Sequence, residues 1–96
     1  MARVLLDLNH LAFQAQLPAL DAGPLRQIRK TLQKLSKLDW AAVHRDPDLK
    51  WEAITGQAGE HSLRVSLQCR AVVLRQGDHM RILSLHFDHD SAYGRK

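Results

Sequence analysis

Arginine side chains recur in the last third of the chain, on segments where apolar residues occupy every second position. These segments run from His61 to Arg75 and from Arg81 to Phe87, and the second leads into a cluster of His, Asp and Tyr that ends at Tyr93. Such alternation is typical of strands that bury one face and expose the other. Guanidinium groups on the exposed face, with imidazoles at its rim, suit a surface that binds phosphate. We therefore interpret the chain as an RNA-directed protein.

A metal site is the other chemistry that this region suggests. The run His86-Phe-Asp-His-Asp90 places imidazoles and carboxylates close together, and both are ligands of divalent ions. The spacing matches no standard zinc motif, however, and the chain has no second ligand cluster. We therefore expect no metal ion and no other cofactor.

Short strands separated by turns are expected to carry the arginines. Residues 61–67 show the clearest alternation, and residues 70–75 and 80–87 predict a hairpin closed around residues 76–78. Residues 49–54 predict one more strand. In the 61–67 strand, alternate side chains should point into the core and out of it. The inward set is Leu63, Val65 and Leu67, and the outward set is Ser62, Arg64 and Ser66.

The N-terminal half predicts one strand followed by helices. Residues 3–8 are rich in Val and Leu, as in a buried strand. Asn9 is expected to cap a short helix that Pro18 ends or bends. Further along, residues 39–43 predict a capped turn of helix, and residues 45–48 predict a loop because Asp-Pro rarely continues a helix.

A longer helix is predicted over residues 25–38, after the Gly23-Pro24 break. Its apolar stripe is Leu25, Ile28, Leu32 and Leu35, and its basic stripe is Arg26, Lys30, Lys34 and Lys37. The basic stripe has two interpretations. It is either the solvated face of a helix that packs on the core, or a face that binds phosphate or an acidic partner.

Together these elements predict a single domain over residues 1–96 with an α+β fold. An N-terminal strand and two helices would pack on one face of a small antiparallel sheet. The formal net charge of +4 favours nucleic acid or an acidic protein as a partner. The single cysteine, Cys69, excludes an internal disulfide and fits the cytoplasm, and no apolar run approaches the roughly 20 residues of a membrane span.

The order of elements, together with four short motifs, resembles the RelE/ParE superfamily of bacterial toxins. The motifs are Lys50-Trp-Glu-Ala-Ile-Thr-Gly, Ser62-Leu-Arg-Val, Cys69-Arg-Ala-Val-Val and His89-Asp-Ser-Ala-Tyr. The resemblance extends over nearly the whole chain, and its specific part follows residue 49. It implies a RelE-like fold and a toxin of a type II toxin–antitoxin system, made beside an acidic antitoxin that silences it.

The resemblance favours the RelE, YafQ and HigB-like branch of the superfamily. Proteins of that branch are endoribonucleases that cut mRNA on the ribosome without a metal ion, so the chain would inhibit translation and arrest growth. The alternative is a ParE-like toxin that poisons DNA gyrase and has no nuclease activity. A third hypothesis is a basic adaptor that keeps the fold and the antitoxin contact without either activity.

For a nuclease, the resemblance implies a catalytic set. Arg70 matches the arginine that binds the scissile phosphate, and Arg64 matches a nearby basic position. His89 resembles the C-terminal general acid, and Tyr93 matches an aromatic residue that stacks on RNA. Asp88 or Asp90 could hold the imidazole in the required tautomer.

Two departures from the family pattern affect this set. Ser62 and Arg64 stand where the family has a basic pair, and Phe87 stands where it often has arginine, so no general base is assigned. His86 is the second choice for the general acid. We expect the remaining RNA contacts from Arg81, Lys30, Lys34, Lys37 and His86. Both tryptophans are expected to pack in the core or at its rim.

Overall fold

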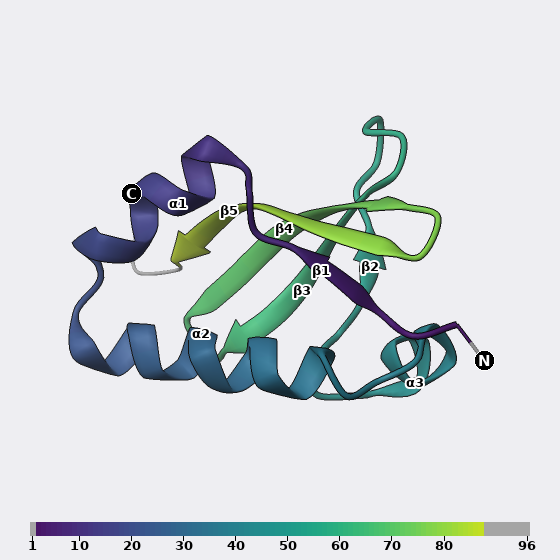
Figure 1. The fold of residues 1–96 in the computed structure, drawn as a ribbon, viewed down its shortest axis with the longest axis horizontal. Helices are drawn as coiled ribbons and strands as arrows, with labels where there is room; N and C mark the ends of the chain where they lie inside the picture. The colour runs from purple at the N-terminus through teal and green to yellow at the C-terminus, as the bar shows by residue number, and fades with distance from the viewer. Residues whose placement is uncertain (1, 88–96) are drawn as a thin grey trace.

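The computed structural model describes residues 2–87, and in this range a five-stranded sheet carries helices on one of its faces (Figure 1). The helical elements are α1 (Leu11–Gln16), the 3-10 turn η1 (Leu17–Ala19), α2 (Ala22–Leu35) and α3 (Trp40–Arg45). The strands are β1 (Leu5–Asp7), β2 (Glu52–Ala53), β3 (Glu60–Ser66), β4 (Cys69–Gln76) and β5 (His79–Phe87). They lie in the order β1-β5-β4-β3-β2.

The direction of the strands follows from how they are connected. Strands β2 to β5 pair antiparallel, as the sequence predicts, whereas β1 pairs parallel with β5. A parallel pair requires a long crossover, and the whole chain between β1 and β5 supplies one. The predicted α+β fold is confirmed, and the sheet is mixed rather than wholly antiparallel.

The predictions for the two turns that join β3, β4 and β5 differ in their outcome. The predicted hairpin is confirmed, because Gln76 pairs with His79 and Gly77 adopts a φ of 59° in the turn between them. The prediction that Leu67 points into the core is wrong, since this side chain is 86% exposed. Strand β3 ends at Ser66, and its pairing with β4 shifts register after Arg64, so the alternation breaks before Leu67.

The core lies between the sheet and the helices. In the ladder, Leu63 pairs with Ala71, which pairs with Leu85, and all three are buried. Helix α1 contributes Phe13 to this layer, and α2 contributes Ile28 and Leu35 as its apolar stripe predicts; the side chains concerned are at most 3% exposed. The part of the apolar stripe from Ile28 to Leu35 therefore faces the sheet, and the basic stripe faces away from it. Leu25, which the prediction also placed in the apolar stripe, is 43% exposed.

A side chain of α1 completes the exposed edge of β5 beyond the end of β1. The amide of Gln16 donates a hydrogen bond to the carbonyl oxygen of Leu85 at 2.9 Å and accepts one from the backbone N–H of the same residue at 2.8 Å. The paired residues of β5 next to β1 are 79–81, so the backbone of Leu85 lies past that pairing. The Gln16 amide thus satisfies two backbone groups that no strand reaches.

The helix ends show one correct and one wrong prediction. Asp39 caps α3 by accepting a hydrogen bond from the backbone N–H of Ala42 at 2.8 Å, as the predicted capped turn requires. The prediction that Asn9 caps α1 is wrong, because His10 occupies the cap and Asn9 donates its backbone N–H to Asp7. No helix within residues 2–87 is long and apolar enough to cross a membrane.

The two tryptophans join α3 to the sheet, and their predicted packing is confirmed. Trp40 is buried, and its ring meets Trp51 edge-on with centroids 5.5 Å apart. Trp51 in turn stacks on His61 at 4.4 Å, and the Arg75 guanidinium lies 3.8 Å above the Trp40 ring. Both tryptophan rings therefore pack against other side chains of the protein, and their role is structural.

Two carboxylates tie distant segments together. Asp46 accepts a hydrogen bond from Lys34 at 2.7 Å, and this bond lowers the pKa of the Asp46 carboxyl below its ordinary value of 3.8. The pKa of Asp7 is also lowered, first by the backbone N–H of Asn9 and then by the Arg81 guanidinium at 3.0 Å. The first contact joins α2 to the loop after α3, and the second joins β1 to β5.

We expect Asp46→Asn to lower the free energy of unfolding at pH 7 by about 0.5 kcal/mol, the size of a partly exposed ion pair. Because the folded-state pKa is depressed below its ordinary value of 3.8, the contribution is present above that value and is lost as the pH falls through the folded-state pKa. Urea denaturation over a series of decreasing pH values should therefore show the gap to wild type narrowing in acid. Asp48→Asn, in the same loop, is the control, and a gap that stayed constant over the whole series would contradict the ion-pair origin.

Candidate active site

The structure places three predicted site residues in one row across the sheet. Arg64 on β3 pairs with Arg70 on β4, and Arg70 pairs with His86 on β5. Side chains of directly paired residues point to the same face, with Cβ atoms about 5 Å apart. This row lies on the face away from the helices, because the adjacent row faces the helices and is buried. That buried row consists of Leu63, Ala71 and Leu85.

An acid that the sequence interpretation did not assign joins this row. The carboxylate of Glu52 on β2 lies 3.9 Å from the guanidinium of Arg70, measured from Oε1 to Nη1. Strands β2 and β4 flank β3, so the two side chains meet above β3. Ser62 of β3, which pairs with Glu52, is only 9% exposed although it points to this outer face. The sequence held one signal that could have identified this acid: Glu52 is the single acidic residue in the motif Lys50-Trp-Glu-Ala-Ile-Thr-Gly.

The His86 imidazole is held by a neighbour on the same face of β5. Its Nε2 lies 2.9 Å from the hydroxyl oxygen of Ser84, two residues earlier in the strand. A hydroxyl can donate to a neutral ring or accept from a protonated one, so the contact suits both protonation states. The ring is also exposed. His86 is therefore an oriented, accessible imidazole directly beside Arg70.

The row and Glu52 together form the outer-face site, which consists of Arg64, Arg70, His86 and Glu52. The side chain of Arg70 remains 46% exposed and that of Glu52 63% exposed. Such groups can bind a phosphate, accept a proton and donate one. Within residues 2–87 the site is an open surface, because its members stand on the face of the sheet away from the helices.

The other predicted site residues are distributed differently. Arg81 lies on the outer face toward the β4–β5 turn, and its guanidinium is bound to Asp7 at 3.0 Å. His89 and Tyr93 lie outside the described residues, as do the two orienting carboxylates Asp88 and Asp90. Among residues 2–87, no group of three or more His, Cys, Asp and Glu side chains is placed to hold a metal ion.

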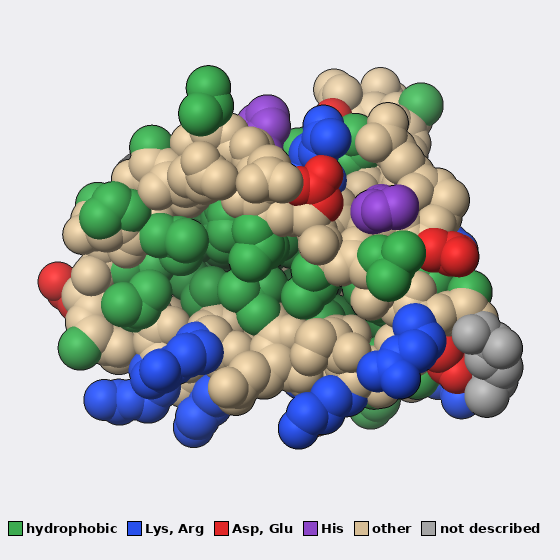
Figure 2. Space-filling view, in the orientation of Figure 1, with side chains coloured by type: hydrophobic (Ala, Val, Ile, Leu, Met, Phe, Trp, Pro, Cys, Tyr) green, Lys and Arg blue, Asp and Glu red, His purple; other side chains and the backbone are tan. Residues whose placement is uncertain are grey.

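The three predicted lysines lie on the helix layer and not beside the row. Lys30, Lys34 and Lys37 belong to or follow α2, on the opposite side of the sheet from Arg70. Figure 2 shows Lys and Arg side chains along the lower border of the molecule, where α2 runs. The ammonium group of Lys34 forms an ion pair with the carboxylate of Asp46. The predicted RNA contacts are thus divided between two faces.

A second surface lies between α1 and α2. Figure 2 shows apolar side chains in a furrow between these helices, with the cations of α2 along one side. Thr31, Leu32 and Val65 are partly exposed in this furrow. The residues beneath them belong to the buried core and are Phe13, Ile28, Leu35, Leu63, Ala71, Ile82 and Leu85. An apolar strip with a cationic border is complementary to an amphipathic acidic segment.

Known proteins resemble this chain in structure and not in sequence. No protein-family model matches it, and no curated protein sequence does either. The structure of the YoeB dimer from Staphylococcus aureus matches with a TM-score of 0.55 at 20% identity. The YoeB–YefM complex from the same organism matches with a TM-score of 0.52 at 17% identity. Each match covers 92% of this chain and 100% of the other.

Two further solved structures extend the likeness. A conserved hypothetical protein from Helicobacter pylori matches with a TM-score of 0.57 at 21% identity, covering 92% of this chain and 96% of the other. A YoeB/ParE toxin from Agrobacterium tumefaciens matches with a TM-score of 0.51 at 19% identity, covering 91% and 99%. The chain therefore has the fold of YoeB-type toxins, and the resemblance to the RelE/ParE superfamily is confirmed at the level of the fold.

We expect Glu52→Gln to strengthen binding of single-stranded RNA, because the carboxylate competes with phosphate for Arg70. The gain should be about twofold to fivefold in Kd, as for an exposed ion pair. The measurement is a titration with 2′-O-methyl RNA, which lacks a free 2′-hydroxyl and stays intact. Glu60→Gln is the matched control, since Glu60 lies at the far end of β3 opposite Leu74. An equal gain in both variants would indicate a general charge effect and not a site at Arg70.

Proposed function

We propose that this chain is the toxin of a bacterial type II toxin–antitoxin system, and that it cleaves mRNA bound to the ribosome in the cytoplasm. The observation that carries the proposal is the row of Arg64, Arg70 and His86, with Glu52 beside it, on the outer face of a YoeB-type fold. These groups are of the types that RNA scission by an internal 2′-hydroxyl requires.

The reaction needs charge stabilisation and two proton transfers. The 2′-oxygen attacks the adjacent phosphorus, and Glu52 accepts the proton of the hydroxyl as the bond forms. Arg70, assisted by Arg64, donates hydrogen bonds to the phosphorane oxygens, whose negative charge increases. An imidazolium then protonates the 5′-oxygen as its bond to phosphorus breaks. The products are a 2′,3′-cyclic phosphate and a 5′-hydroxyl, and both proton transfers use side chains.

Two imidazoles are proposed for the second proton transfer. His89 is the first choice on the family resemblance, with Tyr93 stacking on a base nearby. His86 is supported by its position directly beside Arg70 and by the hydroxyl of Ser84 that orients it. The role that the two candidates compete for, donation of a proton to the 5′-oxygen, is one that histidine commonly fills in enzymes.

The open character of the outer-face site supports dependence on the ribosome. Orientation of the reacting groups contributes a large part of catalysis, and enclosed sites usually supply it themselves. Within residues 2–87, Arg70 and Glu52 stand on the outer face of the sheet with side chains 46% and 63% exposed. A substrate held in a fixed conformation by the ribosome would supply the orientation that this surface does not.

The partner is proposed to be an acidic antitoxin. S. aureus YoeB, which shares the fold, is solved in complex with YefM. In this chain, the partly buried Leu32 and Val65 in the furrow between α1 and α2 offer apolar contacts, and the basic stripe of α2 borders them. Lys30 and Lys37 would then bind the antitoxin in place of RNA.

The alternative function is poisoning of DNA gyrase. It is favoured by the likeness to the YoeB/ParE toxin of A. tumefaciens, because the fold is common to both activities. In that case the furrow and the basic stripe would bind a protein, and the outer-face site would be unused. Inhibited DNA supercoiling with unchanged mRNA would support this alternative.

Arg70→Ala should reduce mRNA cleavage about 100-fold or more, as does removal of a donor to a developing oxyanion. The measurement is global mapping of RNA 5′ ends after expression in a bacterium. Arg45→Ala is the matched control, because it removes an exposed arginine from α3 on another part of the molecule. Cleavage that survives Arg70→Ala, with the protein folded by circular dichroism, would reject the assignment.

Glu52→Gln should slow cleavage while it strengthens RNA binding, because the amide keeps the size of the side chain and cannot accept the proton. We expect a loss of about 100-fold in the single-turnover rate on ribosome-bound mRNA. His86→Gln and His89→Gln, compared in the same assay, identify the general acid by which of them removes the fall in rate on the alkaline side, where an imidazolium loses the proton that it must donate. A Glu52→Gln rate equal to wild type would exclude Glu52 as the base.

A further inference from the structure

We propose that the cleft between the start of α2 and the β3–β4 turn binds the base of a nucleotide next to the cleaved bond. This inference rests on the proposed nuclease function and adds a specificity site to it. The cleft encloses about 550 Å³, within the range of pockets that hold small organic ligands. It is separate from the outer-face site and from the furrow between α1 and α2.

The cleft adjoins the outer-face site through the sheet itself. Ser66, Cys69 and Phe87 pair with one another across β3, β4 and β5, one ladder position beyond Arg64, Arg70 and His86. Successive ladder positions lie about 3.3 Å apart along a strand, and their side chains point to opposite faces. The cleft therefore begins where the outer-face site ends, around the end of the sheet.

This placement fits an RNA strand that bends around the sheet. A phosphate bound at Arg70 lies on the outer face, and the next nucleotide in the chain reaches the end of the sheet at Cys69 and Phe87. A single-stranded nucleotide can splay its base away from its neighbours, and proteins that grip single-stranded RNA hold such bases in pockets. One bound strand could thus occupy both sites.

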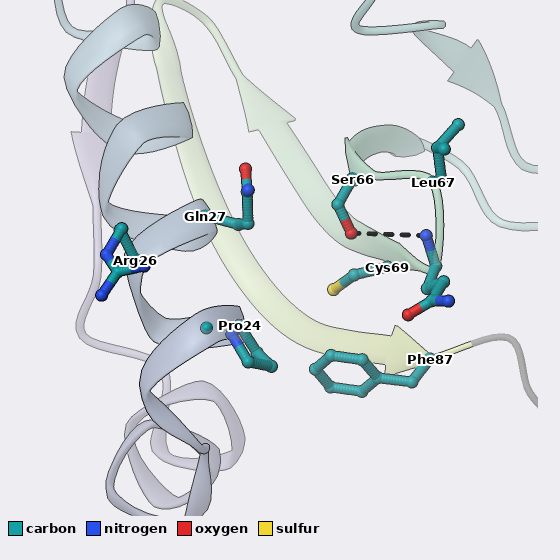
Figure 3. Close-up of a pocket in the computed structure, with 9 residues that line it drawn as sticks. Pro24, Arg26, Gln27, Ser66, Leu67, Cys69 and Phe87 are labelled. Carbon is teal, nitrogen blue, oxygen red and sulfur yellow. Dashed lines mark hydrogen bonds between the residues drawn. The ribbon is translucent and has the colours of Figure 1, made fainter.

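The lining of the cleft suits a base better than a phosphate. Figure 3 shows the Phe87 ring directed toward Pro24 at one end, with Gln27 of α2 on one side and the turn at Ser66 on the other. Pro24 offers an apolar surface for stacking, and Phe87 adds to the apolar lining of the cleft. The carboxamides of Gln27 and Gln68 each donate and accept hydrogen bonds, as the edges of bases do. The charged side chain in this lining is Arg26.

The turn that forms one wall is internally braced. Ser66 accepts a hydrogen bond through its hydroxyl oxygen from the backbone N–H of Gln68 at 3.3 Å, which Figure 3 marks. Leu67 lies at the tip of the turn and is exposed. The wall is thus set by its own hydrogen bond, and a base entering the cleft would meet a preformed surface.

Gly23 provides the test, because it lines the cleft and a Cβ added there would meet nothing within 4 Å. Gly23→Phe should fill the cleft, whereas Gly23→Ala adds one methyl group and serves as the matched control. The probe is a mixture of 2′-O-methyl RNA hexanucleotides, followed by amide chemical shifts in NMR spectra. We expect the shifts to include Gln27 and Gln68, and Kd to weaken about tenfold in Gly23→Phe alone, the loss of one stacked base.

Equal affinity of both Gly23 variants, or shifts confined to the outer face, would overturn the inference. Mapping of RNA 5′ ends separates this outcome from failure of the nuclease proposal. If the chain cuts mRNA, Gly23→Phe should flatten the base preference next to the cut while Gly23→Ala keeps it. Cuts with an unchanged preference in Gly23→Phe would leave the nuclease intact and reject the base site, as would a cleft that contacts only a protein partner.

Discussion

Backbone pairing between β3, β4 and β5 is the constraint on which the candidate site depends. A slip of one residue in this ladder would turn Arg70 toward the core and Ala71 toward solvent. Burial of Leu63, Ala71 and Leu85 beneath the helices resists such a slip. The direction of the arginines is therefore fixed by apolar packing on the opposite face, and not by the charged groups themselves.

The charges in the outer-face site compensate one another in part. Arg64 and Arg70 are paired on adjacent strands, where like charges directly opposite each other are destabilising. The carboxylate of Glu52, 3.9 Å from Arg70, offsets part of this repulsion. A phosphate entering the site would take over that compensation and leave the carboxylate available as an acceptor of protons. The same three groups would thus serve both the free protein and the proposed binding of RNA.

The two faces of the sheet have different chemistry, and this division organises the molecule. The outer face holds the groups that we propose to bind phosphate, whereas the helix face holds the furrow and the basic stripe of α2. The cleft at the end of the sheet is bordered by both layers, because α2 and the β3–β4 turn line it together. Contacts of a partner with α2 can therefore reach the neighbourhood of the site without covering Arg70.

The sequence by itself determined the strands, the long helix and the outward position of Arg64. Apolar residues that recur every two or every 3.6 positions indicate which side of a strand or helix is buried, and this pattern can be read from a short stretch of sequence. Only the tertiary structure decided that Glu52 meets Arg70, that Leu67 is exposed, and that β1 runs parallel to β5. Each of these depends on where a strand ends or which distant strand it joins. Such contacts are set by packing between segments remote in sequence, and no local pattern records them.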